Sequence, residues 1–375
     1  MEPHVDDAAQ RPAWLLDEPV FAQLNTLEGV LRDALHCADA DLADAALHLV
    51  RRGGKRLRPT LLFLAAAAVQ EQAAAAPAAV RQCDPFRIKP PKPAATVPTS
   101  VPHIAQCSAS RQSAPEADLL RMAAAVELLH VASLYHDDVM DRAASRRGGH
   151  TANALWGQAT AVTAGTFVVA RAMRLLSRLD PQLAAWAGDS ALALSVGQLQ
   201  EVENAHYLGH RLESYTRIAA RKTAVLFELS CRAGAYLAGA GQAGIDALGR
   251  YGRCVGMAFQ AADDMLDITS TTAALGKRAG SDLREGVYGL PVLIALSQNS
   301  PASRRLRVLL GRSDLSETDV AQAHQLISES GGVIGAGNIA HNYAHQAVAH
   351  ISELHDSAAK RSLVGLTHYI VLRRH

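Results

Sequence analysis

The chain has 375 residues, of which 49% are hydrophobic and only 5% aromatic, and its formal net charge is +1. This length can bury a large core, and the nearly balanced charge indicates neither a nucleic-acid partner nor an anionic membrane surface. The five cysteines form no C-x-x-C pair, which argues against a disulfide framework or a zinc site and favours the reducing cytoplasm.

Helical periodicity predicts an all-α protein with a single domain over residues 21–375. Residues 1–20, which contain three prolines, are expected to be a loose leader, and regular apolar spacing begins near Phe21. The longest apolar runs, such as Thr60–Val69 and Ala159–Ala170, are too short to cross a bilayer and predict buried helices.

A proline-rich segment at residues 71–117 interrupts this pattern. Its eight prolines exclude a regular helix, and we expect an irregular or disordered surface insertion. A partner-binding arm is the alternative. Helical spacing resumes at Asp118 and continues almost to the C-terminus. The basic pair Arg373-Arg374 is expected to be a solvated end, and a basic residue that reaches into an active site is the alternative.

Two copies of the pattern D-D-x-x-D lie within helical stretches. On each helix the first and last aspartates are four residues apart and therefore share one face. Clustered carboxylates destabilise a helix unless a cation neutralises them, and hard oxygen ligands without Cys or His indicate Mg²⁺. The six carboxylates are Asp137, Asp138, Asp141, Asp263, Asp264 and Asp267.

Basic and polar groups surround both clusters. Two of the basic groups sit beside paired glycines, which let the backbone approach an anion, and arginine presents a planar fork to phosphate oxygens. Together the groups predict a cavity for two diphosphates bridged by magnesium. The candidates are Lys55, Arg58, His130, Arg146, Arg147, Lys222, Thr223, Gln260 and Lys277.

These motifs resemble the trans-isoprenyl diphosphate synthases of the polyprenyl synthetase family, and most of all the bacterial long-chain members. The matching motifs are G-G-K-R-L-R-P from Gly53, E-L-L-H ending at His130, H-D-D-V-M-D from His136, K-T at Lys222 and F-Q-A-A-D-D-M-L-D from Phe259. The resemblance implies a large antiparallel helical bundle around a central cavity. It also implies a homodimer and two to three Mg²⁺ ions with bound diphosphate.

The resemblance further implies a role for each matched residue. Lys55, Arg58, His130 and Arg147 would hold the diphosphate of isopentenyl diphosphate. Arg146, Lys222, Thr223, Gln260 and Lys277 would contact the allylic diphosphate. Asp137, Asp141, Asp263 and Asp267 would bind Mg²⁺, and Asp138, Asp264 and Lys222 would complete the catalytic set.

Product length depends on what lies beneath this cavity. Ala132 and Ser133, five and four residues before Asp137, are both small, whereas family members that stop early resemble one another in carrying a bulky aromatic residue near this point. We therefore expect a product of about C30–C50 that can partition into a membrane. A short-chain synthase making geranylgeranyl or farnesyl diphosphate is the main alternative, and a class I terpene cyclase or a non-catalytic partner subunit are lesser ones.

The chain departs from the family pattern in two places. A Gly-Asp pair common in the family reads Gly165-Thr166, and a Gly-Lys-x-Thr-Leu-Pro sequence reads Gly286–Pro291 with neither lysine nor threonine. No predicted metal ligand is affected.

Overall fold

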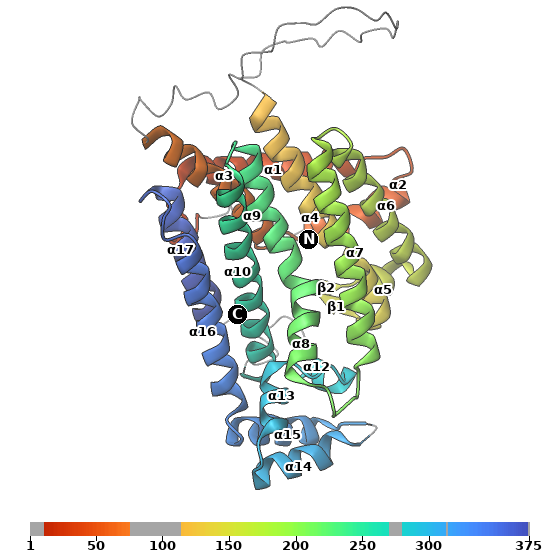
Figure 1. Cartoon of the computed structure of the whole chain (residues 1–375). Helices are drawn as coiled ribbons and strands as arrows, with labels where there is room; N and C mark the ends of the chain where they lie inside the picture. The colour runs from red at the N-terminus through yellow and green to blue at the C-terminus, as the bar shows by residue number, and fades with distance from the viewer. Residues whose placement is uncertain (1–10, 76–113, 270–279, 313, 374–375) are drawn as a thin grey trace, which may run out of the picture.

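The computed structural model describes residues 11–75, 114–269, 280–312 and 314–373. Within these ranges long helices form a bundle, and strand is limited to one short antiparallel pair, which confirms the all-α prediction (Figure 1). The N-terminal half contains α1 (Glu18–Leu35), α2 (Ala40–Arg51), α3 (Leu57–Ala75), α4 (Ala114–Met140), β1 (Ser145–Arg146), β2 (Gly149–His150), α5 (Ala152–Trp156), α6 (Gln158–Leu176) and α7 (Pro181–Glu203). The remainder contains α8 (Leu212–Ala219), the π-helical turn η1 (Ala220–Ala224), α9 (Val225–Leu237), α10 (Gln242–Thr269), α12 (Ser281–Glu285), α13 (Leu290–Ser297), α14 (Pro301–Leu310), α15 (Glu317–Glu329), α16 (Gly332–His350) and α17 (Ala358–Leu372).

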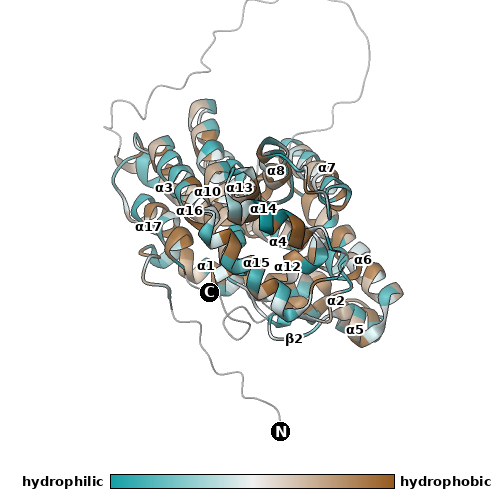
Figure 2. Cartoon of the chain, turned by 90° about the horizontal axis from the view of Figure 1, so that it is seen from below, coloured by the Kyte–Doolittle hydropathy of each residue, from teal (hydrophilic) through white to brown (hydrophobic). Residues whose placement is uncertain are grey.

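The helices α4, α9 and α10 form the centre of the bundle. α4 contacts α1, α3, α6 and α9, while α10 contacts α9, α16 and α17. Every residue from Met122 to Leu129 in α4 is buried, as expected for a helix that is apolar around most of its circumference. Seen from below, α3 and α17 lie on one side of the bundle and α5, α6 and α7 on the other (Figure 2).

The expected loose leader is wrong for the residues that the structure describes. Leu15 is 1% exposed, and the Leu16 amide donates to the Ser362 hydroxyl of α17 at 2.8 Å. The side chain of Asp17 accepts from the Val20 amide at 3.0 Å and so caps α1. The helical domain therefore begins before residue 21.

The predicted insertion is narrower than its proline pattern indicated. α3 continues to Ala75 and α4 begins at Ala114, so both ends of the segment 71–117 are helical. Residues 76–113 lie outside the described residues.

Among the described helices, α6 alone has the length and composition of a membrane span, where the sequence predicted none. About a third of this segment (33%) is buried, and α6 packs along α4. A core helix passes the same test of length and composition.

Candidate active site

The first aspartate cluster lies at the C-terminal end of α4. Burial raises the pKa of Asp137 to about 6, with Lys222 lowering it and the Asp141 carboxylate raising it. Burial also raises the pKa of Asp141, against the effect of Lys222. Burial thus disfavours the ionised form of both carboxyls, and a cation bound between them would offset that cost.

Asp138 has a different role from its neighbour because consecutive helical residues point about 100° apart. It is 1% exposed, and its Oδ1 accepts from Arg146 Nε on β1. Its Oδ2 is buried without a hydrogen-bond partner among the described residues. Asp138 therefore anchors the hairpin that carries the two predicted phosphate-binding arginines.

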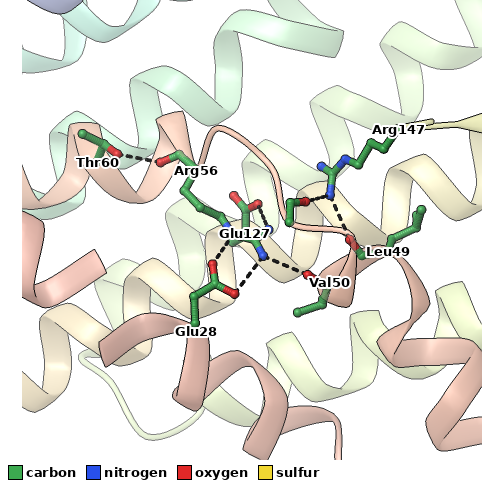
Figure 3. Close-up of polar contacts among 8 residues, drawn as sticks. Glu28, Leu49, Val50, Arg56, Thr60, Glu127 and Arg147 are labelled. Atoms are coloured by element: carbon green, nitrogen blue, oxygen red, sulfur yellow. Dashed lines mark hydrogen bonds and ion pairs between the residues drawn. The ribbon is translucent and has the colours of Figure 1, made fainter. Parts of the chain in front are cut away.

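That hairpin turns through Arg147 and Gly148, whose φ angles of 50° and 72° are both positive, as a tight two-residue turn requires. Arg147 Nη1 donates to the Leu49 carbonyl at 2.9 Å and to the Gly53 carbonyl (Figure 3). The hairpin is thereby fixed to the glycine loop that precedes α3, which brings two motifs about a hundred residues apart into one site.

A cavity of about 190 Å³ lies between the two aspartate-bearing helices and is lined by Asp141, Lys222, Gln260 and Asp264 among others. Lys222 Nζ forms an ion pair with Glu201 of α7. Burial alone would lower the pKa of Lys222, but Glu201 and Asp137 raise it above its usual value. Lys222 is therefore a firmly charged ammonium group at the edge of this cavity.

Lys222 and Thr223 are presented by the π-helical turn η1, a feature that the sequence analysis did not predict. π-helical turns of this kind often occur at functional sites because they re-aim side chains. Glycines in the packed helices make room for it: a Cβ at Gly256 of α10 would lie 2.5 Å from the Ala224 Cα. The wide turn thus fits against α10 only because position 256 has no side chain.

A chain of hydrogen bonds connects η1 to the second aspartate cluster. The Thr223 hydroxyl donates to Gln260 Oε1 at 2.6 Å, and Gln260 Nε2 donates to Asp264 Oδ1 at 2.8 Å. Asp264 Oδ2 accepts from the Leu290 amide at 2.7 Å, although burial raises its pKa to about 7. Asp264 therefore orients Gln260 and fixes the start of α13.

This contact also explains one departure from the family pattern. A Cβ at Gly289 would lie 2.8 Å from Asp264 Oδ2. The loop approaches the carboxylate too closely for a threonine in the same conformation, so the glycine fits this backbone.

The other two aspartates of α10 lie one helical turn apart. Asp263 is 46% exposed and forms an ion pair with Arg373, while Asp267 is 3% exposed and lines a narrow cavity beside Asp264 and Asp282. Across the described residues, no three Asp, Glu, His or Cys side chains gather closely enough to hold a metal ion by themselves.

Three predicted groups, Arg58, His130 and Arg147, form a second, positively charged region between α3, α4 and the hairpin. Burial lowers the pKa of Arg58 to about 10, with Glu127 raising it and Arg147 lowering it. Its guanidinium lies 4.9 Å from the centre of the Phe227 ring. Burial and the surrounding arginines, Arg58 first, hold the pKa of His130 well below its ordinary value, so the ring is neutral. Positive charge in this region exceeds negative charge, which suits an anion.

Arg56 and Glu127 support this region, and sequence reasoning assigned them no role. Arg56 is 7% exposed, and its guanidinium pairs with Glu28 at 2.7 Å and with Glu127 at 2.8 Å (Figure 3). It also donates to the Val50 carbonyl at 3.2 Å. Within the motif, Lys55 and Arg58 thus flank a buried arginine that fixes the loop. The signal was a buried acid, Glu127, in the otherwise apolar helix that carries His130.

The structure distinguishes the two predicted chain-length positions. Ser133 is half-buried and, four residues before Asp137, lies on the same face of α4. Ala132 is 1% exposed, packs in the main core, and lies about 140° around the helix from Asp137. Lys277 falls outside the described residues.

The expectation of a solvated C-terminal end is wrong for Arg373. Its side chain is only 3% exposed and lies against α10, where it pairs with Asp263 and donates to the Phe259 carbonyl at 3.2 Å. Arg374 falls outside the described residues.

Comparison with known proteins places these features in one family. The polyprenyl synthetase family profile matches residues 96–327, which include both aspartate clusters. The chain is 34% identical to a nonaprenyl diphosphate synthase of Mycobacterium tuberculosis, over 94% of this chain and 93% of that protein. It is 36% identical to an octaprenyl diphosphate synthase of Haemophilus influenzae, over 67% of this chain and 76% of that protein.

Among solved structures, a polyprenyl synthase from Caulobacter crescentus in complex with calcium and isoprenyl diphosphate superimposes with a TM-score of 0.80. It is 29% identical in sequence, and the match covers 96% of this chain and 98% of that one. The chain therefore belongs to the polyprenyl synthetase family and is an enzyme of the trans-polyprenyl diphosphate synthase type.

Proposed function

We propose that this enzyme condenses isopentenyl diphosphate with an allylic diphosphate, with Mg²⁺ as cofactor, and extends the product to a long-chain all-trans polyprenyl diphosphate. The observation that carries the proposal is the arrangement of charge. Two helices carry aspartates at the cavity, and two separate groups of basic residues lie beside them. One diphosphate fits each basic group.

The donor set fits Mg²⁺. Mg²⁺ in proteins is usually held by one or two carboxylates together with substrate phosphates and waters, which agrees with the lack of a complete protein-only site in the described ranges. Asp137 with Asp141 would hold metal from α4, and Asp263 with Asp267 from α10. The calcium in the Caulobacter relative supports a divalent ion. We propose two to three ions with bound diphosphate.

The residues of the chain divide the chemistry between the two regions. Bound Mg²⁺ would stabilise the negative charge that develops on the leaving allylic diphosphate. Lys222 would assist with its ammonium group, and Arg146, Gln260 and Thr223 would orient the allylic substrate. Lys55, Arg58, His130 and Arg147 would hold isopentenyl diphosphate so that its double bond attacks the allylic carbon. The carbon–oxygen bond to diphosphate breaks, a carbon–carbon bond forms, and a proton is lost to the departed diphosphate.

The long-chain product is supported by the small side chain of Ser133 on the face of Asp137 and by relatives named for nonaprenyl and octaprenyl products. A short-chain geranylgeranyl or farnesyl product remains the alternative. A terpene cyclase is disfavoured because the basic region around Arg58 would have no second diphosphate to bind.

We propose that the enzyme acts as a homodimer in the cytoplasm. α6 and α7 present large exposed apolar side chains, including Met173 at 62%, Leu192 at 68% and Leu199 at 59% exposure. A second copy covering such a patch would remove it from water. The free cysteines Cys37, Cys231 and Cys254 fit a reducing compartment.

The proposal is tested by separating the two diphosphate sites. Arg58→Ala should raise the KM for isopentenyl diphosphate, and Lys222→Ala should raise that for the allylic substrate. Arg361→Ala, at an exposed ion pair with Asp356, is the matched control and should change neither. Equal effects of the first two variants on both substrates would contradict the division.

A further inference from the structure

Arg373, which directly follows α17, contacts the second aspartate cluster on α10. Its guanidinium pairs with Asp263 Oδ1, donates to the Phe259 carbonyl at 3.2 Å and lies 4.0 Å from the centre of the Phe259 ring. All three contacts are to one turn of α10. An arginine side chain normally keeps its charge in water, so the 3% exposure of this side chain requires an attractive partner.

Asp263 is that partner, whereas the nearby Lys55 is repulsive. Lys55 lies close by, with its Nζ 6.0 Å from the centre of the Tyr369 ring on α17. Burial lowers the pKa of Lys55, and Arg373 lowers it as well, whereas Asp263 raises it. Arg373 and Lys55 therefore share the surroundings of the Asp263 carboxylate, and the ring of Phe259 contributes a weaker cation–π contact to Arg373.

We propose that Arg373 is the internal counter-ion of Asp263, and that a metal ion bound by Asp263 displaces it. The inference rests on the proposed function because it requires Asp263 to be a metal ligand. A divalent cation bound at Asp263 Oδ1, the oxygen that Arg373 contacts, would lie next to the guanidinium, and the two positive charges would repel each other. Metal binding must therefore compete with the ion pair, and the end of α17 is released from α10 when metal is bound.

The competition is measured directly by titrating Mn²⁺ into the full-length protein with saturating inorganic pyrophosphate and following free Mn²⁺ by electron paramagnetic resonance. Arg373→Ala should bind Mn²⁺ more tightly, by about two- to fivefold, a shift typical of removing one partly exposed ion pair. Arg373→Lys keeps the charge without the planar fork and should fall between wild type and Arg373→Ala. Arg361→Ala, on the same helix, should match wild type.

Hydrogen–deuterium exchange gives a second readout that does not depend on affinity. Amides near the end of α17, around Tyr369 and Ile370, should exchange faster when wild-type protein binds Mn²⁺ and pyrophosphate. In Arg373→Ala they should exchange fast with or without metal.

The possible outcomes separate the two claims. Wild type that binds no Mn²⁺ with pyrophosphate would overturn both the metal assignment and the counter-ion. Wild type that binds Mn²⁺, with unchanged or weaker binding by Arg373→Ala, would overturn the counter-ion alone. Weaker binding would show that Arg373 positions Asp263 for metal and does not compete with it.

Discussion

Placing a phenylalanine at position 133 should shorten the product, whereas the same residue at position 132 should not. Ser133 precedes Asp137 by four residues, so its side chain lies about 6 Å back along α4 and within about 40° of the same face. Ala132 lies on a different face and is 1% exposed within the core. The two neighbouring positions therefore form a matched pair that differs mainly in direction.

The structure sets the expected magnitudes. At Ser133, which is half-buried and donates its hydroxyl to the His130 carbonyl at 2.8 Å, a phenyl ring would project from the face of α4 that carries Asp137. Because Asp137 and Lys222 are untouched, the first condensation should retain turnover within about threefold of wild type, a change below about 1 kcal/mol. At Ala132 the ring would overpack a filled core and should destabilise the fold by about 1–3 kcal/mol.

The assay is to extend farnesyl diphosphate with isopentenyl diphosphate and to size the products by reversed-phase chromatography, alongside thermal melting. Ser133→Phe should give geranylgeranyl diphosphate, the product of the first condensation, as its main product, with little change in Tm. Ala132→Phe should lower Tm and keep the wild-type product length. Shortening by Ala132→Phe with no shortening by Ser133→Phe would refute the assignment of the lining face.

Three further outcomes are expected. Arg58→Ala and Lys222→Ala should each weaken binding of a different substrate by about 1.5–3 kcal/mol, roughly 10- to 150-fold in KM, because each removes one charge-assisted phosphate contact. Steady-state titration of each substrate measures these KM values. Increases in KM below about threefold would contradict the prediction. Replacing residues 76–113 with a short flexible linker should leave Tm and turnover unchanged, because the proline-rich composition offers little apolar surface to bury; a large loss of either would show that the segment has a structural role. Without metal, Asp137→Asn should be more stable than wild type near pH 8, by on the order of 1–3 kcal/mol. A carboxyl whose pKa is raised from 3.8 to about 6 favours folding when protonated and loses that contribution as pH rises, so the advantage of the variant should shrink steadily toward about pH 4. Urea unfolding across this range measures it, and a difference that is constant with pH would show that the carboxylate is not perturbed.

The sequence identified most of the site because its signals are local. Asp137 and Asp141 share a face through helical spacing alone, and the same holds for Asp263 and Asp267. Arginines beside glycines marked the loops that we propose bind the diphosphates. The fold class followed from periodicity, and the structure confirms it.

Features that depend on distant contacts could not be predicted. Arg373 is 110 residues from Asp263 in sequence, and nothing local indicates that it is buried. The ion pair of Arg56 with Glu127 needs α3 and α4 to be adjacent, although a lone glutamate in an apolar helix was a usable signal. The π-helical turn at Lys222 depends on close packing against Gly256, which propensities do not encode. The direction of Asp138, by contrast, could have been predicted from the sequence, because consecutive residues on a helix point about 100° apart.

The most direct test of the proposed activity is to incubate the purified full-length protein with farnesyl diphosphate, isopentenyl diphosphate and Mg²⁺ and to determine product size. The predicted result is a series ending in a long-chain polyprenyl diphosphate, abolished by a chelator and restored by Mg²⁺. Release of a cyclic hydrocarbon without consumption of isopentenyl diphosphate, or no condensation at all, would contradict the proposed activity. A product that stops at geranylgeranyl diphosphate would contradict its long-chain part.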